Sequence, residues 1–317
     1  MQFVFGPVPS RRLGQSLGID PVPLKTCNWN CVYCQLGRTR PVTNARKDYF
    51  PPEDILAEIQ QTLDTLDPAD VDWITFLGSG EPSLYASLGD LIRAVKESTD
   101  IPVAVITNGS LLYLPGVRQS LLPADAIMPS LDAGTADLYR KLNRPHPAVY
   151  FERYIEGLSA FRAAYSGKLW IEVMLIRDLN DTESALRAIA AHLDTIQPDE
   201  VHLSTPTRPP AEPWVQPPDE EGMLRARAIL GSKAQVLAPI EGWFDLGEYL
   251  NVVDAIIAII TRHPMTEAEL LQTLDRWTTG EVTTSLQELT ASGRAQVVER
   301  YGTHFWSAAP AFYPDKN

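Results

Sequence analysis

Three cysteines, Cys27, Cys31 and Cys34, lie within eight consecutive residues and are the only cysteines of the 317-residue chain. Their C-x3-C-x2-C spacing would strain a disulfide. A structural zinc site normally takes four protein ligands, and the nearest histidine, His146, is more than one hundred residues away. Three thiolates on one short loop instead suit a [4Fe–4S] cluster in which one iron has no protein ligand. That iron can bind a chelating molecule from outside.

Short apolar runs alternate with amphipathic stretches from residue 15 to about residue 230. The runs are rich in Val, Ile and Leu, and their continuous apolar character is typical of strands covered on both faces. The amphipathic stretches between them have the helical period. Expected strands are 16–20, 73–77, 103–107, 126–131, 169–176 and 201–205, and expected helices are 53–66, 88–97, 151–164, 183–193 and 219–230.

Repeated strand–helix units predict an α/β fold with a parallel sheet and right-handed crossovers. About six units fit either an open sheet or an incomplete barrel, and in both cases ligands gather at the C-terminal ends of the strands. The cysteine loop follows the first expected strand and therefore belongs to that edge. Residues 205–218 contain six prolines and cannot be helical. We expect this segment to form a wall of the pocket rather than a simple spacer.

The motifs at these strand ends are similar to those of the radical S-adenosylmethionine (radical SAM) superfamily. Tyr33 supplies the aromatic residue before the last cysteine of the hallmark motif, and residues 78–82, Gly-Ser-Gly-Glu-Pro, resemble its GGEP motif. Residues 107–109 and 130–132 match further motifs, each at the end of an expected strand. The resemblance covers most of residues 1–230 and implies a partial (β/α)6, TIM-like radical SAM barrel.

The resemblance implies an enzyme with a [4Fe–4S] cluster and SAM as cofactors and an electron donor such as flavodoxin or ferredoxin. Cys27, Cys31 and Cys34 would hold three irons, while SAM chelates the fourth. The reduced cluster would cleave SAM to methionine and a 5′-deoxyadenosyl radical, which abstracts hydrogen from a substrate. Gly78, Gly80 and Glu81 would meet the amino end of SAM, Asn108, Ser130 and Asp132 its ribose or carboxylate, and Tyr33, Met174 and Leu203 its adenine.

Residues 6–20 and 142–146 resemble a branch of radical SAM proteins related to the wyosine-tRNA synthesis enzymes. Those enzymes extend a methylated guanosine in tRNA and carry a second iron–sulfur cluster held by three further cysteines. This chain has no cysteine beyond its first three, so a second all-cysteine cluster is excluded.

The charge is unevenly distributed along the chain. The net charge is −13, which argues against bulk electrostatic capture of nucleic acid or an anionic membrane. The first 50 residues nevertheless hold seven basic and two acidic residues, which leaves room for an anionic substrate such as tRNA. Arg144, His146 and Arg208 are the candidate substrate or acid–base groups. For each of them, a salt bridge or an ordinary loop position is the alternative.

Residues 248–317 follow a different pattern. Expected helices at 248–262, 267–274 and 281–290, followed by a β-hairpin at 295–307, resemble a winged helix-turn-helix. We therefore expect a radical SAM domain at 1–247 and a winged-helix-like domain at 248–317. A DNA-recognition helix should be basic, but the third helix here carries Glu281 and Glu288 and no Lys or Arg. DNA binding is therefore disfavoured.

Three functions are compatible with these features. The leading one is a radical SAM enzyme, formally an oxidoreductase or transferase, that acts on RNA or another anionic substrate. In the second, the C-terminal domain recruits a peptide or protein for modification. In the third, the protein is an iron–sulfur regulator that binds DNA without SAM chemistry.

Membrane insertion and export are not predicted. No window approaches the ~20 apolar residues of a transmembrane helix. The first residues lack the basic region and the long apolar core of a signal peptide. We therefore expect a cytoplasmic protein.

Overall fold

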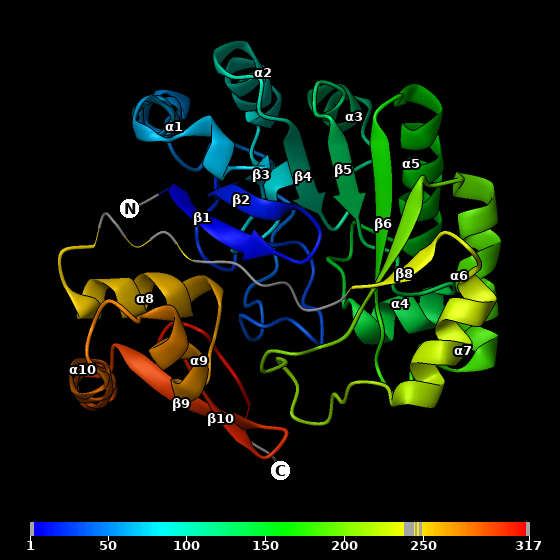
Figure 1. Cartoon of the computed structure of the whole chain (residues 1–317). Coiled ribbons are helices and arrows are strands. Elements are labelled where there is room, and N and C mark those ends of the chain that lie inside the picture. The colour runs from blue at the N-terminus through cyan, green and yellow to red at the C-terminus, as the bar shows by residue number, and fades with distance from the viewer. Residues whose placement is uncertain (1–2, 238–243, 245, 247–248, 315–317) are drawn as a thin grey trace.

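An eight-stranded sheet forms the body of the protein (Figure 1). The computed structural model describes residues 3–237, 244, 246 and 249–314. The strands neighbour one another in chain order, and only β1 is antiparallel to its neighbour. They are β1 (Val4–Ser10), β2 (Gly14–Ile19), β3 (Trp73–Phe76), β4 (Val103–Thr107), β5 (Ala126–Pro129), β6 (Lys168–Met174), β7 (Glu200–Ser204) and β8 (Ala234–Val236). Among the described residues β1 and β8 are the edges, so the sheet is open.

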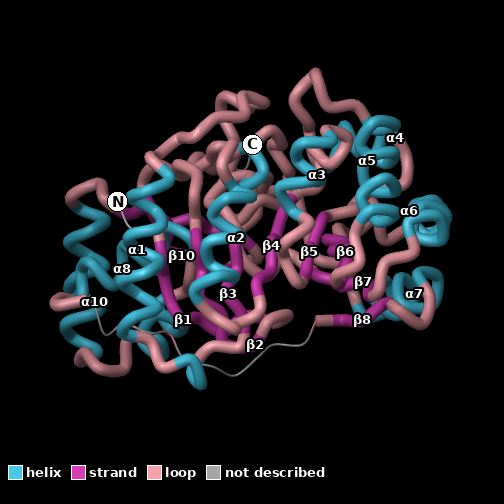
Figure 2. The backbone as a smooth tube through the Cα atoms, turned by 90° about the horizontal axis from the view of Figure 1, so that it is seen from above, coloured by secondary structure: helices cyan, strands magenta, loops and turns pink. Residues whose placement is uncertain are grey.

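Helices cover the outer side of the curved sheet, as the view from above shows (Figure 2). They are α1 (Pro52–Thr65), α2 (Leu88–Ser98), α3 (Pro115–Leu121), α4 (Ala136–Leu142), α5 (Phe151–Ala164), α6 (Glu183–Ile196) and α7 (Glu220–Leu230). The predicted α/β fold with a mostly parallel sheet is confirmed. In the described part of the chain, no helix has both the length and the apolar character needed to cross a membrane.

Four short elements were missing from the sequence prediction, and each has a physical reason. β1 contains Pro7 and Pro9, which are unusual within a strand, and it lies at the sheet edge where proline is tolerated. β8 has three residues, two of them exposed. The helices α3 and α4 have seven residues each, too few for the helical period to stand out.

The inner face of the sheet is filled by side chains from the β1–β2 hairpin and from the strands. Leu13 at the hairpin tip is 2% exposed and packs with Met128 and Trp170. Trp170 also meets Trp73 edge-on, with ring centroids 5.7 Å apart. Burial of Leu13 contributes about 2 kcal/mol. The hairpin is therefore anchored inside the curve of the sheet.

The C-terminal region forms three helices and an antiparallel hairpin with a separate hydrophobic core. The elements are α8 (Val252–Arg262), α9 (Glu267–Thr273), α10 (Thr279–Ala291), β9 (Ala295–Arg300) and β10 (Thr303–Ala308). A capping box of Thr266 and Glu269 begins α9. A second box, Thr278 with Glu281, starts α10 earlier than predicted. The predicted boundary at residues 247 and 248 lies outside the described residues.

This C-terminal region holds the chain segment that follows Cys34. The Arg38 N–H donates to the Phe312 carbonyl at 2.7 Å, and the Tyr313 hydroxyl donates to the Gln35 carbonyl. The Gln35 side-chain amide donates to the Arg262 carbonyl at 2.8 Å. Segments almost 280 residues apart in sequence therefore meet directly beside the cysteine loop.

Gly37 is the tightest point of this contact. Its φ is +74°, and a Cβ there would lie 2.4 Å from the Phe312 carbonyl oxygen. We predict that Gly37→Ala lowers the free energy of unfolding by about 2 kcal/mol or more, because both the backbone conformation and the space are lost.

Thermal and denaturant unfolding of the full chain would measure this loss. Gly280→Ala is the matched control, since nothing lies within 4 Å of the Cβ position there. Equal stabilities of the two variants would contradict the assigned contact.

Candidate active site

The cysteine loop is pinned by backbone hydrogen bonds from three separate segments. The N–H groups of Asn30 and Val32 donate to the carbonyls of Asn143 and Leu142, at 3.0 and 2.9 Å. His146 N–H donates to the Asn28 carbonyl at 2.7 Å, and Glu212 N–H donates to the Val32 carbonyl at 2.9 Å. Thr43 N–H donates to the Cys27 carbonyl at 3.0 Å. The loop is thereby fixed at the C-terminal edge of the sheet.

Each cysteine sulfur accepts an N–H group. The Lys25 ammonium donates to Cys34 Sγ at 3.1 Å, and the Trp29 N–H donates to Cys27 Sγ at 3.4 Å. The Asn143 side-chain amide donates to Cys31 Sγ at 3.7 Å. All three cysteines are free thiols and only partly buried as residues. Such N–H···S contacts to ligating sulfurs are a known means of stabilising thiolate-bound iron–sulfur clusters.

The thiols also influence one another electrostatically. Burial raises the pKa of Cys27 to about 12, and the nearby Glu81 carboxylate adds to this. Burial also raises the pKa of Cys31, and Cys27 and Cys34 raise it further. Three adjacent thiolates therefore need more positive charge than Lys25 supplies, and cluster irons would provide it. Within the described residues, no three His, Cys, Asp or Glu side chains converge on a single metal ion; the three thiols would each bind a different iron of a cluster.

Glu81 connects two strand ends with its buried carboxylate. It accepts hydrogen bonds from the Thr107 hydroxyl at 2.6 Å and from the Asn108 N–H at 2.7 Å. Its own N–H donates to the Thr26 carbonyl at 2.8 Å. A Cβ on Gly80 would lie 2.0 Å from that same carbonyl oxygen. The backbone of the segment before Cys27 therefore approaches Gly80 so closely that a side chain at position 80 would not fit.

Asp132 is the second buried carboxylate of this edge and is 1% exposed. It accepts hydrogen bonds from the Tyr33 hydroxyl, from the Asn143 amide at 2.8 Å and from the Met174 N–H at 2.8 Å. Burial raises the pKa of Asp132 to about 6, although these three hydrogen bonds lower it. Asp132 thus ties β6 to the cysteine loop.

Of the remaining residues predicted to contact SAM, Asn108, Gly78 and Ser130 lie at strand ends, whereas Leu203 lies in the core. The Asn108 amide donates to Asn28 Oδ1 at 2.8 Å and lies 3.9 Å from Cys27 Sγ, so it belongs to the cysteine loop. Gly78 follows β3, and Ser130 bridges to Glu172 on β6. Leu203 is 1% exposed in the core. Strand alternation places it on the face opposite Ser204, which contacts Met174 Sδ. The Leu203 side chain is therefore not brought to the Met174 side of the sheet.

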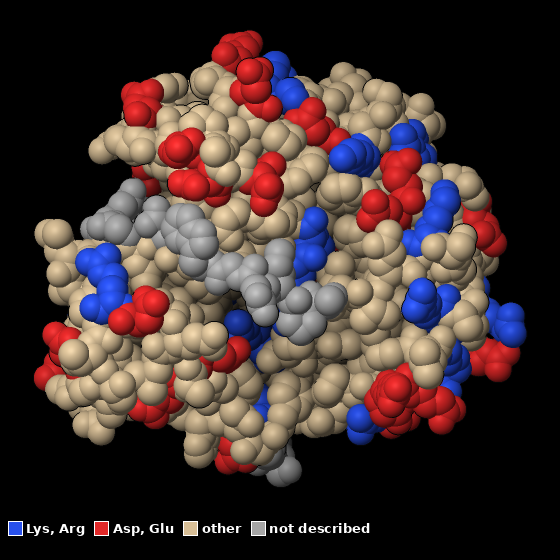
Figure 3. Space-filling model, in the orientation of Figure 1, with Lys and Arg blue, Asp and Glu red and all other residues tan. Residues whose placement is uncertain are grey.

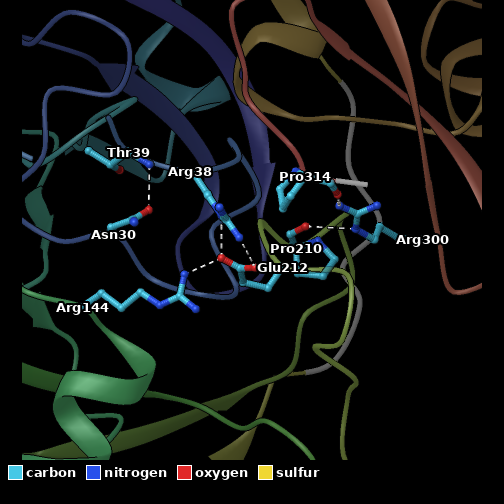
Figure 4. A network of polar contacts seen from close by, with 8 residues as sticks. All are labelled: Asn30, Arg38, Thr39, Arg144, Pro210, Glu212, Arg300 and Pro314. Carbon is cyan, nitrogen blue, oxygen red and sulfur yellow. Dashed lines mark hydrogen bonds and ion pairs between the residues drawn. The ribbon is translucent and has the colours of Figure 1, made fainter. Parts of the chain in front are cut away.

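Arg144 forms part of a buried ion network rather than a free substrate group (Figure 4). The Glu212 carboxylate is 3% exposed and is held by two bonds of 2.7 Å from Arg38 and by Arg144. Burial raises the pKa of Glu212, but the two guanidinium groups outweigh burial and hold it below its ordinary value. Nearby, Arg300 on β9 donates to the Pro210 and Pro314 carbonyls. The proline-rich segment is thereby fixed between the cysteine loop and the C-terminal region.

His146 and Arg208 lie in different places. His146 lines a pocket of about 420 Å³ between the loop after α4 and the start of α5, together with Arg140 and Tyr150. Its Nδ1 accepts the Ala148 N–H at 3.2 Å. Arg208 bonds to Glu269 at 2.8 Å and to the Pro264 carbonyl at 3.1 Å. The structure does not bring the three candidate substrate residues together.

Three residues that contact the cysteine loop at the C-terminal edge of the sheet were not among the predicted site residues. Lys25 contacts Cys34, Asn143 contacts both Cys31 and Asp132, and Glu212 holds the loop through two arginines. Asn143 lies within the 142–146 segment that the sequence had singled out, so that signal was available. Lys25 and Glu212 carried no motif, and only the tertiary structure reveals them.

Comparisons with known proteins agree with this geometry. The Radical SAM superfamily profile matches residues 22–189, more than half of the chain. The "UPF0026 protein" of Methanocaldococcus jannaschii is 36% identical over 284 residues, which cover 87% of each protein. A Brachyspira hyodysenteriae protein named "GTPase Obg" is 42% identical over 233 residues. Those residues are 74% of this chain and only 34% of that protein.

A solved structure shares the fold. The radical SAM methyltransferase from Sphaerobacter thermophilus superposes with a TM-score of 0.54 and 19% identity, over 70% of this chain and 66% of that one. The sheet and the cysteine edge therefore define an enzyme of the radical SAM class, and such enzymes use a [4Fe–4S] cluster and SAM. Within that superfamily, the chain belongs to the UPF0026 family.

Asp132 predicts a particular pH dependence of stability. Its pKa is raised from 3.8 to about 6 in the folded state. Because the folded protein then holds this proton more tightly than the unfolded chain, the contribution is full below about pH 4 and is lost as the pH rises through 6. It amounts to about 3 kcal/mol.

Asp132→Asn removes this titration. Chemical unfolding between pH 4 and pH 7 should show the stability of the wild type falling relative to the variant as the pH rises. The exposed Asp137→Asn is the control. A constant difference between wild type and Asp132→Asn across this range would contradict the assignment.

Glu212→Gln tests the buried ion network. We expect a loss of about 2 kcal/mol at pH 7, because Arg38 and Arg144 lose a shared, buried carboxylate. The loss should shrink as the pH falls below the ordinary Glu pKa of 4.5, since the folded pKa lies lower still. Glu183→Gln breaks an exposed ion pair with Arg187 and should cost less than about 1 kcal/mol. Equal losses would refute the network's role.

Proposed function

We propose that this enzyme uses a cluster held by Cys27, Cys31 and Cys34 to cleave SAM reductively and to abstract hydrogen from an anionic substrate. The observation that carries the proposal is the set of three free thiols, each accepting an N–H group, at the C-terminal edge of a parallel sheet. When bound, the cluster and SAM supply the one-electron cleavage that yields methionine and a 5′-deoxyadenosyl radical. An electron donor such as flavodoxin or ferredoxin would supply the electron.

The residues around the thiols bind and orient the cofactors in this proposal. Asn143 is 1% exposed, and its Oδ1 has no hydrogen-bond partner among the described residues. An amine or hydroxyl hydrogen of SAM would satisfy this oxygen. Glu81 and Asp132 place negative charge near the loop, which suits a ligand with ammonium and sulfonium groups. Gly78, Asn108, Ser130 and Met174 would complete the SAM pocket.

The C-terminal region favours the leading function over the two alternatives, a peptide-modifying radical SAM enzyme and an iron–sulfur regulator. Its separate hydrophobic core favours a division into two domains near residue 248. Its hairpin side chain Arg300 is 4% exposed and bonds to the Pro210 carbonyl. This contact uses the buried side of the hairpin for packing within the protein, which favours a structural role for the hairpin over recruitment of DNA or a peptide. We infer that this region holds the loop after Cys34 in place.

The proposal is tested by anaerobic reconstitution with iron and sulfide, reduction, and addition of SAM. Formation of 5′-deoxyadenosine is expected, because the open iron can bind SAM. Cys31→Ala should lose both the visible absorption of the cluster and the product. The exposed Ser184→Ala is the control. A fully loaded wild-type protein that forms no 5′-deoxyadenosine would sink the proposal.

A further inference from the structure

We propose that Arg11, with Arg12 and Arg208, binds the phosphate group of a small phosphorylated substrate at the open side of the sheet. Arg11 and Arg12 form the tip of the β1–β2 hairpin, and Arg208 follows β7. This inference rests on the proposed function, because it names the class of the substrate.

The hairpin tip reaches from one edge of the sheet toward the other. Arg12 donates to Glu172 on β6 at 2.7 Å, and Arg11 donates to the Thr207 hydroxyl beyond β7 at 3.1 Å. Leu13 anchors the tip within the inner face. Both arginines are therefore held at the inner side of the curved sheet, where Arg12 is partly buried and Arg11 is exposed to solvent.

The three arginines of this site differ in whether a carboxylate is paired with them. Arg12 is paired with Glu172, and Arg208 is paired with Glu269 at 2.8 Å. Arg11 has no carboxylate partner among the described residues; its polar contact is the neutral Thr207 hydroxyl. Partial burial lowers the pKa of Arg11, and the charges of Arg208 and Arg12 lower it further, while the carboxylates of Glu172 and Glu269 partly offset these effects. Three arginines therefore stand beside two carboxylates, and since arginine stays protonated, a bound anion would balance the remaining positive charge.

A continuous line of contacts joins the arginine site to the predicted SAM pocket. Glu172 accepts the Ser204 hydroxyl at 2.9 Å, and that hydroxyl lies 3.7 Å from Met174 Sδ. The Met174 N–H donates to Asp132, which accepts the Tyr33 hydroxyl beside the last cysteine. A substrate whose phosphate binds Arg11 can therefore direct its other end along the inner face toward SAM.

The surrounding charge favours a small ligand over a polynucleotide. In the view of Figure 3, Asp and Glu side chains are spread over much of the surface, with Lys and Arg side chains among them and beside a hollow in the middle. The chain carries a net charge of −13. A long polyanion would extend beyond the arginine site over the surface of a chain whose net charge is negative, which disfavours its binding. A single phosphate or pyrophosphate group needs only the arginine site, and a guanidinium fork matches its oxygens.

The test measures binding of inorganic phosphate and inorganic pyrophosphate to the full chain at low ionic strength, by 31P NMR titration. Both probes should bind the wild type, and Arg11→Gln should weaken binding about tenfold, because a charge-assisted hydrogen bond is lost. Arg11→Lys should retain part of the affinity. The exposed Arg187→Gln makes the same change of charge on α6 and should bind as the wild type does.

Two outcomes would overturn the inference. One is the absence of probe binding, or equal affinities of Arg11→Gln and Arg187→Gln. The other is a short RNA oligonucleotide that binds the wild type more tightly than pyrophosphate at physiological salt. Thermal unfolding of each variant confirms that it folds. Formation of 5′-deoxyadenosine by the wild type, measured without these probes, decides the proposed function separately.

Discussion

The structure depends on burying a short polar loop without leaving its backbone groups unpaired. Asn28, Trp29 and Val32 are at most 2% exposed, and an unsatisfied buried N–H or carbonyl costs about 1–3 kcal/mol. The loop after α4 and the proline-rich segment supply the partners of Asn30 and Val32. The C-terminal region then fixes the residues after Cys34. Segments far apart in the sequence meet here because the loop cannot satisfy itself.

The same burial gives this edge its electrostatic character. Burial raises the pKa values of Glu81, Asp132 and two of the cysteines, while Lys25 is the cation in contact with a sulfur. Such an edge favours the binding of positively charged groups, namely the irons of a cluster and the ammonium and sulfonium groups of SAM. The acidic net charge is a sum over the whole chain, whereas the arginine site is a local cluster of positive charge. The two are therefore compatible.

The sequence predicted the features whose signal is local. Continuous apolar runs marked six parallel strands, and the cysteine spacing marked the cluster loop. What the sequence could not predict depended on tertiary contacts. The ion pair of Arg208 with Glu269 on α9 is one example. Leu203 lies within the correctly predicted strand β7, but the face on which its side chain lies could be known only from the register with β6. Lys25 and Glu212 gave no signal, because their partners lie in loops whose paths only the fold determines.

Electron paramagnetic resonance of the reduced, reconstituted protein tests the central claim most directly. If Cys27, Cys31 and Cys34 hold a [4Fe–4S] cluster with one open iron, the signal of the reduced cluster should change when SAM is added, because SAM becomes a ligand of that iron. A [4Fe–4S] signal that stays the same with saturating SAM would contradict the account.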